Sequence, residues 1–382
     1  MNTFGNIDPR LEFPIRERYT YLNHASISPI PMSTQAAIAE FARDAAEEGP
    51  INYPAWMHAT NLARETAAAM INAPSAQDIC FVKNTSHGLV VVANSINWQP
   101  GDNVVGFQNE FIANILPWQN LARRGVELRL VPERGGYFYE YDDLVNLIDE
   151  RTRLVTVSWV EYATGLRHDL ARLAEICRER GVLFCVDAIQ GLGVLPVDVQ
   201  ATPIDFLMAD GHKWLLAPEG CGILYINPAV IPQLNDDLTN WYSRVEPYNS
   251  GSGELKPNAM RYEEGTNNHL AINALGASMR LLTSVGNEAI QERIFRLTQR
   301  LIEELHRRDY FVVTPEEWTR RAGIVSFIKD GLEPDAVVKH LQEQHQIVTS
   351  TRRGFLRVSP HFYNDDQDVE RVLAALDAYR AG

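Results

Sequence analysis

Short apolar runs alternate with longer amphipathic runs along most of the chain, and this alternation restricts the fold more than any other feature. Seven runs have the length and composition of strands: 78–82, 102–107, 126–131, 153–160, 182–188, 204–210 and 221–226. Helical patterns lie between several of them, over 86–98, 113–125 and 169–181. This order of strands and helices predicts an α/β fold, with a mainly parallel sheet covered by helices on both faces.

The pattern changes after about residue 270, where two long helical segments lead into a compact mixture of short strands and helices. A chain of 382 residues is also longer than one core usually serves. We therefore predict an N-terminal arm over 1–20, a large domain over 21–270 and a smaller C-terminal α+β domain over 271–382. The segment 240–269 is rich in Gly, Ser, Asn and Pro, and a loop of that length is either mobile or functional.

Charge and cysteine usage exclude several classes of protein. The 35 Lys and Arg against 49 Asp and Glu give a formal net charge of −14, which argues against nucleic acid or an anionic membrane as the main partner. The four cysteines are scattered without metal-ligand spacing, so we expect a reducing compartment, no disulfide framework and no metal. The N-terminus has no secretion-signal pattern, and no run of about 18 apolar residues occurs, so we expect a cytoplasmic protein without a membrane span.

Lys213 stands between two strand-like segments, in ADGHKWLLAPEGCGILYI (209–226). A lysine in that position either extends its charge to water or is held there for chemistry. Burial would lower the pKa of the amine, which would make it a nucleophile toward an aldehyde and afterwards a proton carrier. The other polar groups of the sequence must decide between these two readings.

Two further segments place polar groups at the ends of strands. Asp187 ends the strand-like VLFCVDA, and the carboxyl ends of parallel strands line the ligand crevice of an open α/β sheet. Asn84, Thr85 and Ser86 follow another strand and begin a helix, where hydroxyls and free backbone N–H groups can bind phosphate. Taken alone, either segment would be read as an ordinary helix cap or turn. Together with Lys213 they supply an aldehyde anchor, an acid for a ring nitrogen and a phosphate seat, which pyridoxal phosphate requires.

The motifs VDAIQ (186–190), DGHK (210–213) and EEGTNN (263–268) occur in this order in a known family. The chain resembles the fold-type I pyridoxal-phosphate enzymes of aminotransferase class V, near the branch with cysteine desulfurases, isopenicillin N epimerase and kynureninase. The resemblance extends from YLNHASISPIP (21–31) to LRVSPHFYN (356–364). It implies pyridoxal 5′-phosphate (PLP) as the cofactor, an amino acid as the substrate, and a homodimer with shared active sites.

The resemblance also implies roles for individual residues. Lys213 would form the Schiff base with the cofactor (an internal aldimine), and Asp187 would pair with the protonated ring nitrogen. Arg357 would bind the α-carboxylate of the substrate through two parallel hydrogen bonds. Further substrate-binding candidates are Tyr162, Asn23 and His24. The implied cofactor-binding residues are Thr85, Ser86, Phe111, Asp187, Gln190, His212, Lys213 and Thr266, of which Thr266 would reach the phosphate of the neighbouring subunit.

Several departures from the family pattern bear on the reaction. Phe111 stands where one group of desulfurases has a histidine over the pyridine ring. The stretch 347–359 contains no cysteine, whereas desulfurases carry their nucleophilic cysteine in the matching loop. Because a thiolate accepts the sulfur in that chemistry, this absence disfavours persulfide-forming desulfuration. EYATGLRHDL (161–170) looks more like kynureninase, and Tyr162 either donates to the ring oxygen or substrate or packs as an aromatic. Asp210 replaces a phosphate-binding serine, so we expect it to make a structural hydrogen bond instead.

We therefore predict a PLP-dependent enzyme acting on an amino acid, with a reaction of the class V aminotransferase type. The alternatives on the same fold are a C–S or β-elimination lyase, an amino-acid epimerase and a kynureninase-like hydrolase. A nicotinamide oxidoreductase is a different class, but QGLGVLPVDV has Gly191 and Gly193 without the third glycine of the fingerprint. A non-catalytic binding protein is a further class, which does not account for the set of Lys213, Asp187 and Arg357.

Overall fold

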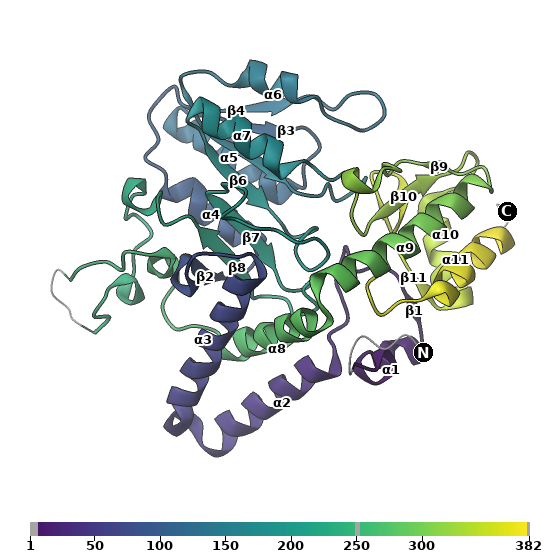
Figure 1. Ribbon diagram of the computed structural model, residues 1–382, viewed down its shortest axis with the longest axis horizontal. Coiled ribbons are helices and arrows are strands. Elements are labelled where there is room, and N and C mark those ends of the chain that lie inside the picture. Colours follow the sequence, from purple (N-terminus) through teal and green to yellow (C-terminus); the bar gives the residue numbers. More distant parts are fainter. Residues whose placement is uncertain (1–6, 249–252, 380–382) are drawn as a thin grey trace.

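A computed structural model describes residues 7–248 and 253–379 (Figure 1). The seven strands predicted from the sequence form one sheet, in the order β2-β8-β7-β6-β5-β3-β4. The pairs from β7 to β4 are parallel, while β8 runs antiparallel to both of its neighbours. The strands are β2 (Ile79–Val82), β3 (Asn103–Phe107), β4 (Glu127–Val131), β5 (Thr152–Ser158), β6 (Leu183–Asp187), β7 (Phe206–Asp210) and β8 (Gly222–Ile226). The sheet is therefore mainly parallel, as the sequence predicts.

Helices connect the parallel strands. α7 (Leu170–Arg180) begins at Asp169, whose side chain accepts from the backbone N–H of Arg172, and it ends at Gly181 with φ 65°. The other connecting helices are α4 (Thr85–Ser95), α5 (Leu116–Asn120) and α6 (Tyr141–Leu147). The single helix predicted over 113–125 is wrong, because that stretch forms three short segments, Ile112–Asn114, α5 and Leu121–Arg124. Pro117 lies in the first turn of α5, where its missing N–H is tolerated and a new helix can begin.

Three longer helices pack together beside the sheet. α2 (Met32–Glu47) and α3 (Tyr53–Met70), for which no helix was predicted, both lie against α8 (His269–Val285). Figure 1 shows α2 and α3 extending away from the sheet. Apolar residues of α8 belong to the same buried cluster as those of the sheet. The change of architecture therefore follows α8, and the boundary at residue 270 remains a prediction.

A smaller α+β unit occupies the C-terminal part of the chain. Its antiparallel sheet has the order β12-β13-β10-β9, and its helices enclose a separate apolar cluster. The elements are α9 (Asn287–His306), β9 (Phe311–Val312), β10 (Val325–Ile328), α10 (Pro334–His345), β12 (Ser350–Arg352), β13 (Phe355–Val358) and α11 (Asp366–Ala378). α9 runs from the end of α8 into this unit (Figure 1). None of the helices within the described residues has the length and apolarity that crossing a membrane requires.

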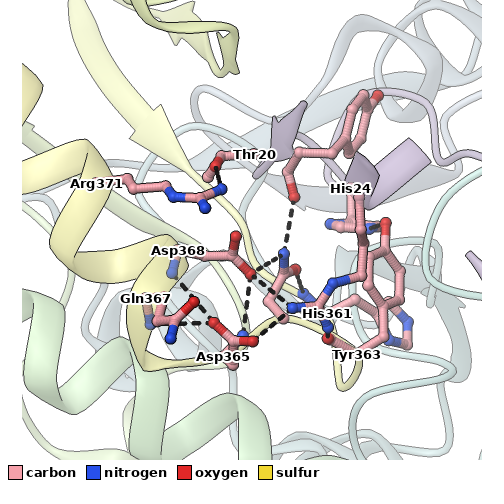
Figure 2. Close-up of polar contacts among 11 residues, drawn as sticks. Thr20, His24, His361, Tyr363, Asp365, Gln367, Asp368 and Arg371 are labelled. Carbon is pink, nitrogen blue, oxygen red and sulfur yellow. Dashed lines mark hydrogen bonds and ion pairs between the residues drawn. The ribbon is translucent and has the colours of Figure 1, made fainter. Parts of the chain in front are cut away.

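The N-terminal segment is attached to the small C-terminal unit rather than to the sheet. After α1 (Pro9–Glu12), the short strand β1 (Thr20–Tyr21) pairs in parallel with β11 (Ile347–Val348). Arg371 donates to the Thr20 hydroxyl at 3.3 Å (Figure 2). Asn364 donates to the Tyr21 carbonyl at 3.2 Å. These contacts direct the following residues, 25–27, to the large domain, where they line the cavity described next.

Candidate active site

A cavity of about 370 Å³ opens at the carboxyl ends of three neighbouring strands, β5, β6 and β7. Their last residues, Ser158, Asp187 and Asp210, all line it. The other lining residues are Ala25, Ser26, Ile27, Asn84, Thr85, Ser86, Phe111, Ala113, Val160, Tyr162, Ile189, Gln190, His212, Lys213, Arg352 and Arg357. A larger cleft of about 790 Å³ contains none of these residues. The smaller cavity is the candidate site, because it lies where parallel strands present their ligand-binding ends and it holds the reactive groups.

Lys213 and Asp187 form the electrostatic centre of the cavity. Asp187 is 2% exposed and accepts a hydrogen bond at Oδ1 from the Ile189 backbone N–H at 3.0 Å. Burial raises the pKa of its carboxyl to about 6. Desolvation lowers the pKa of Lys213 to about 8, and the nearby Asp187 partly opposes that shift. A neutral amine is therefore accessible near neutral pH, as nucleophilic attack on an aldehyde requires.

The start of α4 forms the second wall of the cavity. Asn84 caps the helix by accepting from the His87 backbone N–H at 2.8 Å. The N–H groups of Thr85 and Ser86 belong to the first turn, which has no intrahelical partner for them, and they carry the positive end of the helix dipole. The Thr85 hydroxyl accepts from the Asp210 backbone N–H at 3.1 Å, which joins the helix start to the end of β7. This arrangement suits a phosphate group.

His212 extends the wall formed by α4. Its Nδ1 lies 3.0 Å from the Asp210 carboxylate, and the other oxygen of that carboxylate accepts from the Gly211 backbone N–H at 2.7 Å. Asp210 thus makes the structural hydrogen bond that the sequence predicts, and its carboxylate also faces the imidazole of His212 at the edge of the cavity. With Nδ1 turned to Asp210, the other ring nitrogen of His212 is left for a ligand.

Arg357 lies on the small unit and reaches the same cavity. It is 1% exposed and donates to Ser350 Oγ at 3.2 Å, to the Tyr162 carbonyl at 2.7 Å and to Ser26 Oγ at 2.6 Å. Burial is the largest cause that lowers the pKa of this guanidinium, to about 9. All three of these partners are neutral, so the guanidinium keeps a positive charge that a substrate carboxylate can neutralise.

Two aromatic side chains cover the cavity. Phe111 is 44% exposed, and its ring centroid lies 5.7 Å from Lys213 Nζ. Tyr162 meets Phe111 edge to face, with ring centroids 5.3 Å apart. Its hydroxyl has no hydrogen bond to the described residues, and burial is the largest cause that raises its pKa. The prediction left open whether Tyr162 binds ligand or only packs, and the structure shows it packed against Phe111 and lining the cavity.

The remaining sequence-predicted residues differ in position. Gln190 lines the cavity, but its amide already accepts from Trp214 Nε1 at 2.8 Å and donates to the Ala25 carbonyl at 3.0 Å. Asn23 and His24 do not line the cavity, although they lie next to residues that do. Thr266 is exposed at a different depression, beside Lys83 and Glu264. Its implied contact with the phosphate of a neighbouring subunit remains a prediction.

His24 is a buried structural group. Its Nδ1 donates to the Ser359 carbonyl at 2.8 Å. Its Nε2 therefore accepts from the Tyr363 hydroxyl at 2.7 Å, and Figure 2 shows His24 and Tyr363 side by side. Desolvation is the main cause that holds the pKa of His24 well below its usual value, so the ring is neutral. His24 therefore fixes the chain that continues to Ser26, instead of contacting the cavity itself.

Sequence reasoning assigned no role to four polar groups at this site. Ser26, Ser158 and Arg352 line the cavity, and Glu110 lies behind it with both carboxyl oxygens bonded to the backbone and hydroxyl of Ser158. Burial raises the pKa of Glu110 to about 8. The doublet Arg352-Arg353 in the loop 347–359 is a local signal for a basic group near the site. No local signal distinguishes Ser26 or Glu110 from other polar residues.

The donor set of the cavity fits PLP. A half-buried amine stands beside a buried carboxyl, and a helix N-terminus with hydroxyls and an imidazole forms the adjacent wall. These groups match the aldehyde, the ring nitrogen and the phosphate of that cofactor, respectively. Within the described part of the chain, no cluster of His, Cys, Asp and Glu could hold a metal ion.

The mainly parallel sheet and this cavity at its carboxyl edge define a PLP-dependent enzyme of fold type I. The chain belongs to the aminotransferase class-V family, whose model matches residues 20–372. A probable cysteine desulfurase of Methanothermobacter thermautotrophicus is 30% identical over 393 residues, which cover 97% of each chain. The apo cysteine desulfurase of Thermococcus onnurineus NA1 matches with a TM-score of 0.88 and 26% identity over 97% of each chain.

The cystine C–S lyase C-DES is a further solved relative. Its complex with the reaction product cysteine persulfide has a TM-score of 0.88 and 25% identity, and the match covers 95% of this chain and 98% of that chain. A C-DES variant with glycine covalently linked to the PLP cofactor has a TM-score of 0.90 and 25% identity, and that match covers 98% of this chain and all of the other. The cofactor of the family to which this chain belongs is PLP.

These relatives contradict the functional prediction from the sequence. That prediction favoured an aminotransferase-type reaction and disfavoured persulfide-forming desulfuration, whereas the relatives are cysteine desulfurases and a lyase that yields cysteine persulfide. The prediction was wrong because it rested on the missing cysteine in 347–359. A cysteine in that loop concerns the destination of the sulfur, while cleavage of the Cβ–S bond depends on the cofactor and on removal of the α-proton.

Proposed function

We propose that this protein cleaves the Cβ–S bond of L-cysteine and transfers the sulfur to a thiol as a persulfide. The observation that carries the proposal is the convergence of Lys213, Asp187 and Arg357 on one cavity. They supply an amine, a ring-nitrogen partner and a carboxylate-binding group, and the similarity to cysteine desulfurases selects sulfur chemistry from the reactions open to such a site.

The residues of this chain would act as follows. Arg357 binds the α-carboxylate of cysteine and orients the Cα–H bond. Lys213 removes the α-proton as its neutral amine and later returns a proton to carbon. Asp187 stabilises the proton on the ring nitrogen of the cofactor. When bound, PLP supplies the aldehyde that holds the substrate amine and the ring that takes up the electron pair of Cα.

The overall reaction balances without an external oxidant. The Cβ–S bond of cysteine breaks, the sulfur forms an S–S bond with an acceptor thiol, and a proton replaces sulfur on Cβ. Cysteine and the thiol R–SH therefore give alanine and the persulfide R–S–SH. The acceptor thiol reacts as its thiolate, which is the nucleophilic form.

Two broader expectations belong to the same proposal. We infer a homodimer in which Thr266 contacts the phosphate of the neighbouring subunit, since that residue is exposed and outside the cavity of its own chain. We also infer a cytoplasmic location, because all four cysteines are unpaired thiols.

The test uses the PLP-loaded protein with L-cysteine and a thiol. Alanine and sulfide or persulfide should appear in equal amounts, and Lys213→Ala should abolish both products together with the absorbance of the Schiff base. Asp187→Asn should retain the Schiff base but react far more slowly. Release of a keto acid without sulfur, or binding of PLP with no consumption of cysteine, would refute the proposal.

A further inference from the structure

The hairpin of β12 and β13 brings a second arginine into the cavity beside Arg357. Arg352 lines the cavity, while the adjacent Arg353 is directed elsewhere and forms a bidentate pair with Glu133, at 2.8 Å for both contacts. Arg353 therefore has a carboxylate partner, whereas its neighbour Arg352 has none within the described residues.

The contacts of Arg352 leave its charge uncompensated. Its Nη1 donates to the Thr351 carbonyl at 2.7 Å, and its Nη2 donates to Ser26 Oγ at 3.2 Å. The same Ser26 oxygen accepts from Arg357, so one hydroxyl bridges two guanidinium groups. The positive charge of Arg352 adds to the burial that lowers the pKa of Arg357 and of Lys213. Arg352 and Arg357 therefore give the cavity two guanidinium groups without a carboxylate partner among the described residues, and such a pair favours a ligand with more than one negative group.

The α-carboxylate of the substrate can neutralise only one of the two guanidinium groups. Cysteine carries no second carboxylate, so the partner of Arg352 must come from another part of the reacting system. In sulfur transfer, the remaining participant is the molecule that carries the sulfur away.

The thiols of this chain are poorly placed to be that molecule. All four cysteines are buried, and none of the described residues that line the cavity is a cysteine. Burial raises the pKa of each thiol, so the reactive thiolate is disfavoured in all four. The sulfur acceptor therefore enters the cavity from outside.

We propose that Arg352 binds the carboxylate of a small thiol acid that carries the sulfur out of the active site. This inference rests on the proposed cleavage of the Cβ–S bond. The thiol acid has two possible sources. In the first case it is an acceptor thiol, which gains the sulfur as cysteine becomes alanine. In the second case it is the distal half of the substrate cystine. Cystine and water then give pyruvate, ammonia and cysteine persulfide, because the Cβ–S bond breaks while the S–S bond is retained.

The experiment compares matched partners with and without the carboxylate. In the acceptor arm, the holoenzyme receives L-cysteine with 3-mercaptopropionate or with 3-mercaptopropionamide, and alanine is measured. In the leaving-group arm, it receives the mixed disulfide of cysteine with either of these thiols, and pyruvate is measured. Each arm is run with the wild type, Arg352→Gln and the matched control Arg353→Gln.

The informative quantity is the ratio of kcat/KM for the acid to kcat/KM for the amide. A charge-assisted pair of hydrogen bonds should make that ratio about tenfold or more in the wild type. Arg352→Gln should bring the ratio close to unity, while Arg353→Gln should keep it. The arm that shows the effect identifies the source of the carboxylate.

Two results would overturn the inference. Sulfur release with no preference for the acid, or a preference that survives in Arg352→Gln, would contradict the role of Arg352 and leave the proposed function intact. No sulfur release from any partner, in protein that retains its Schiff base absorbance, would overturn the proposed function and this inference together.

Discussion

Arg64 and Glu263 form a buried ion pair beside β2, and removal of one partner should destabilise the protein more than removal of both. The side chains are 4% and 0% exposed, and the pair joins α3 to the segment that contains Thr266. Glu263 also accepts from the Phe81 backbone N–H at 3.0 Å, and Arg64 also donates to the Ile79 carbonyl at 2.7 Å. Each charge therefore has its counter-charge and a backbone partner within the fold, although the buried Nε of Arg64 has no hydrogen-bond partner among the described residues.

The magnitude follows from that burial. Arg64→Met leaves a carboxylate without its counter-charge in a dry environment, which costs about 3–5 kcal/mol of unfolding free energy. The double variant Arg64→Met, Glu263→Gln buries no net charge, and the amide oxygen of glutamine can still accept from Phe81. It should therefore unfold at a higher urea concentration than Arg64→Met. The coupling between the two substitutions should be about 2–3 kcal/mol, the upper range for contacting residues.

Urea unfolding of the holoenzyme, followed by circular dichroism, measures the effect. If the slope of unfolding free energy against urea concentration is the same for all variants, differences between their unfolding midpoints convert directly into free-energy differences. Additive losses in the double variant would show that the pair contributes nothing as a pair. A cost below about 1 kcal/mol for Arg64→Met would refute the claim that the site is dry.

Three further substitutions test the cavity. Arg357→Lys keeps the charge but loses the parallel hydrogen bonds, so kcat/KM for cysteine should fall by about tenfold to a hundredfold, and an unchanged value would exclude a carboxylate-binding role. Asp210→Asn removes the charge beside His212, so the dissociation constant of PLP, measured by absorbance titration, should rise by about threefold to tenfold if His212 contacts the cofactor. Burial raises the pKa of Glu110 to about 8, above its value in the unfolded chain, so its contribution to stability is present at low pH and is lost as the pH rises toward that value. The urea midpoint of Glu110→Gln relative to wild type should therefore increase between about pH 5 and pH 8, and a constant difference would contradict the assigned pKa.

Much of the fold could be predicted because strands and helices leave local signals. The apolar runs identified all seven strands of the main sheet, and the helical pattern over 169–181 matches α7 and its flanking residues Asp169 and Gly181. Two failures are also physical. The helix expected over 113–125 is interrupted, and α2 and α3 were missed because their apolar residues are small or sparsely spaced. The packing of these helices on α8, rather than their periodicity, determines their position.

The sequence by itself determined the chemistry that the site offers. Lys213, Asp187 and the start of α4 each lie at the end of a strand, and a parallel sheet gathers such ends at one edge. The tertiary structure decided what surrounds that chemistry. Ser26 meets Arg357 across 331 positions of sequence, and Arg352 enters the cavity while Arg353 turns to Glu133. Contacts of that kind depend on how the N-terminal segment and the small unit dock against the sheet, and no local pattern of residues encodes docking. For the same reason the missing loop cysteine misled the functional prediction. A loop shows which groups it contains, but only the assembled cavity shows which charges are left for a ligand.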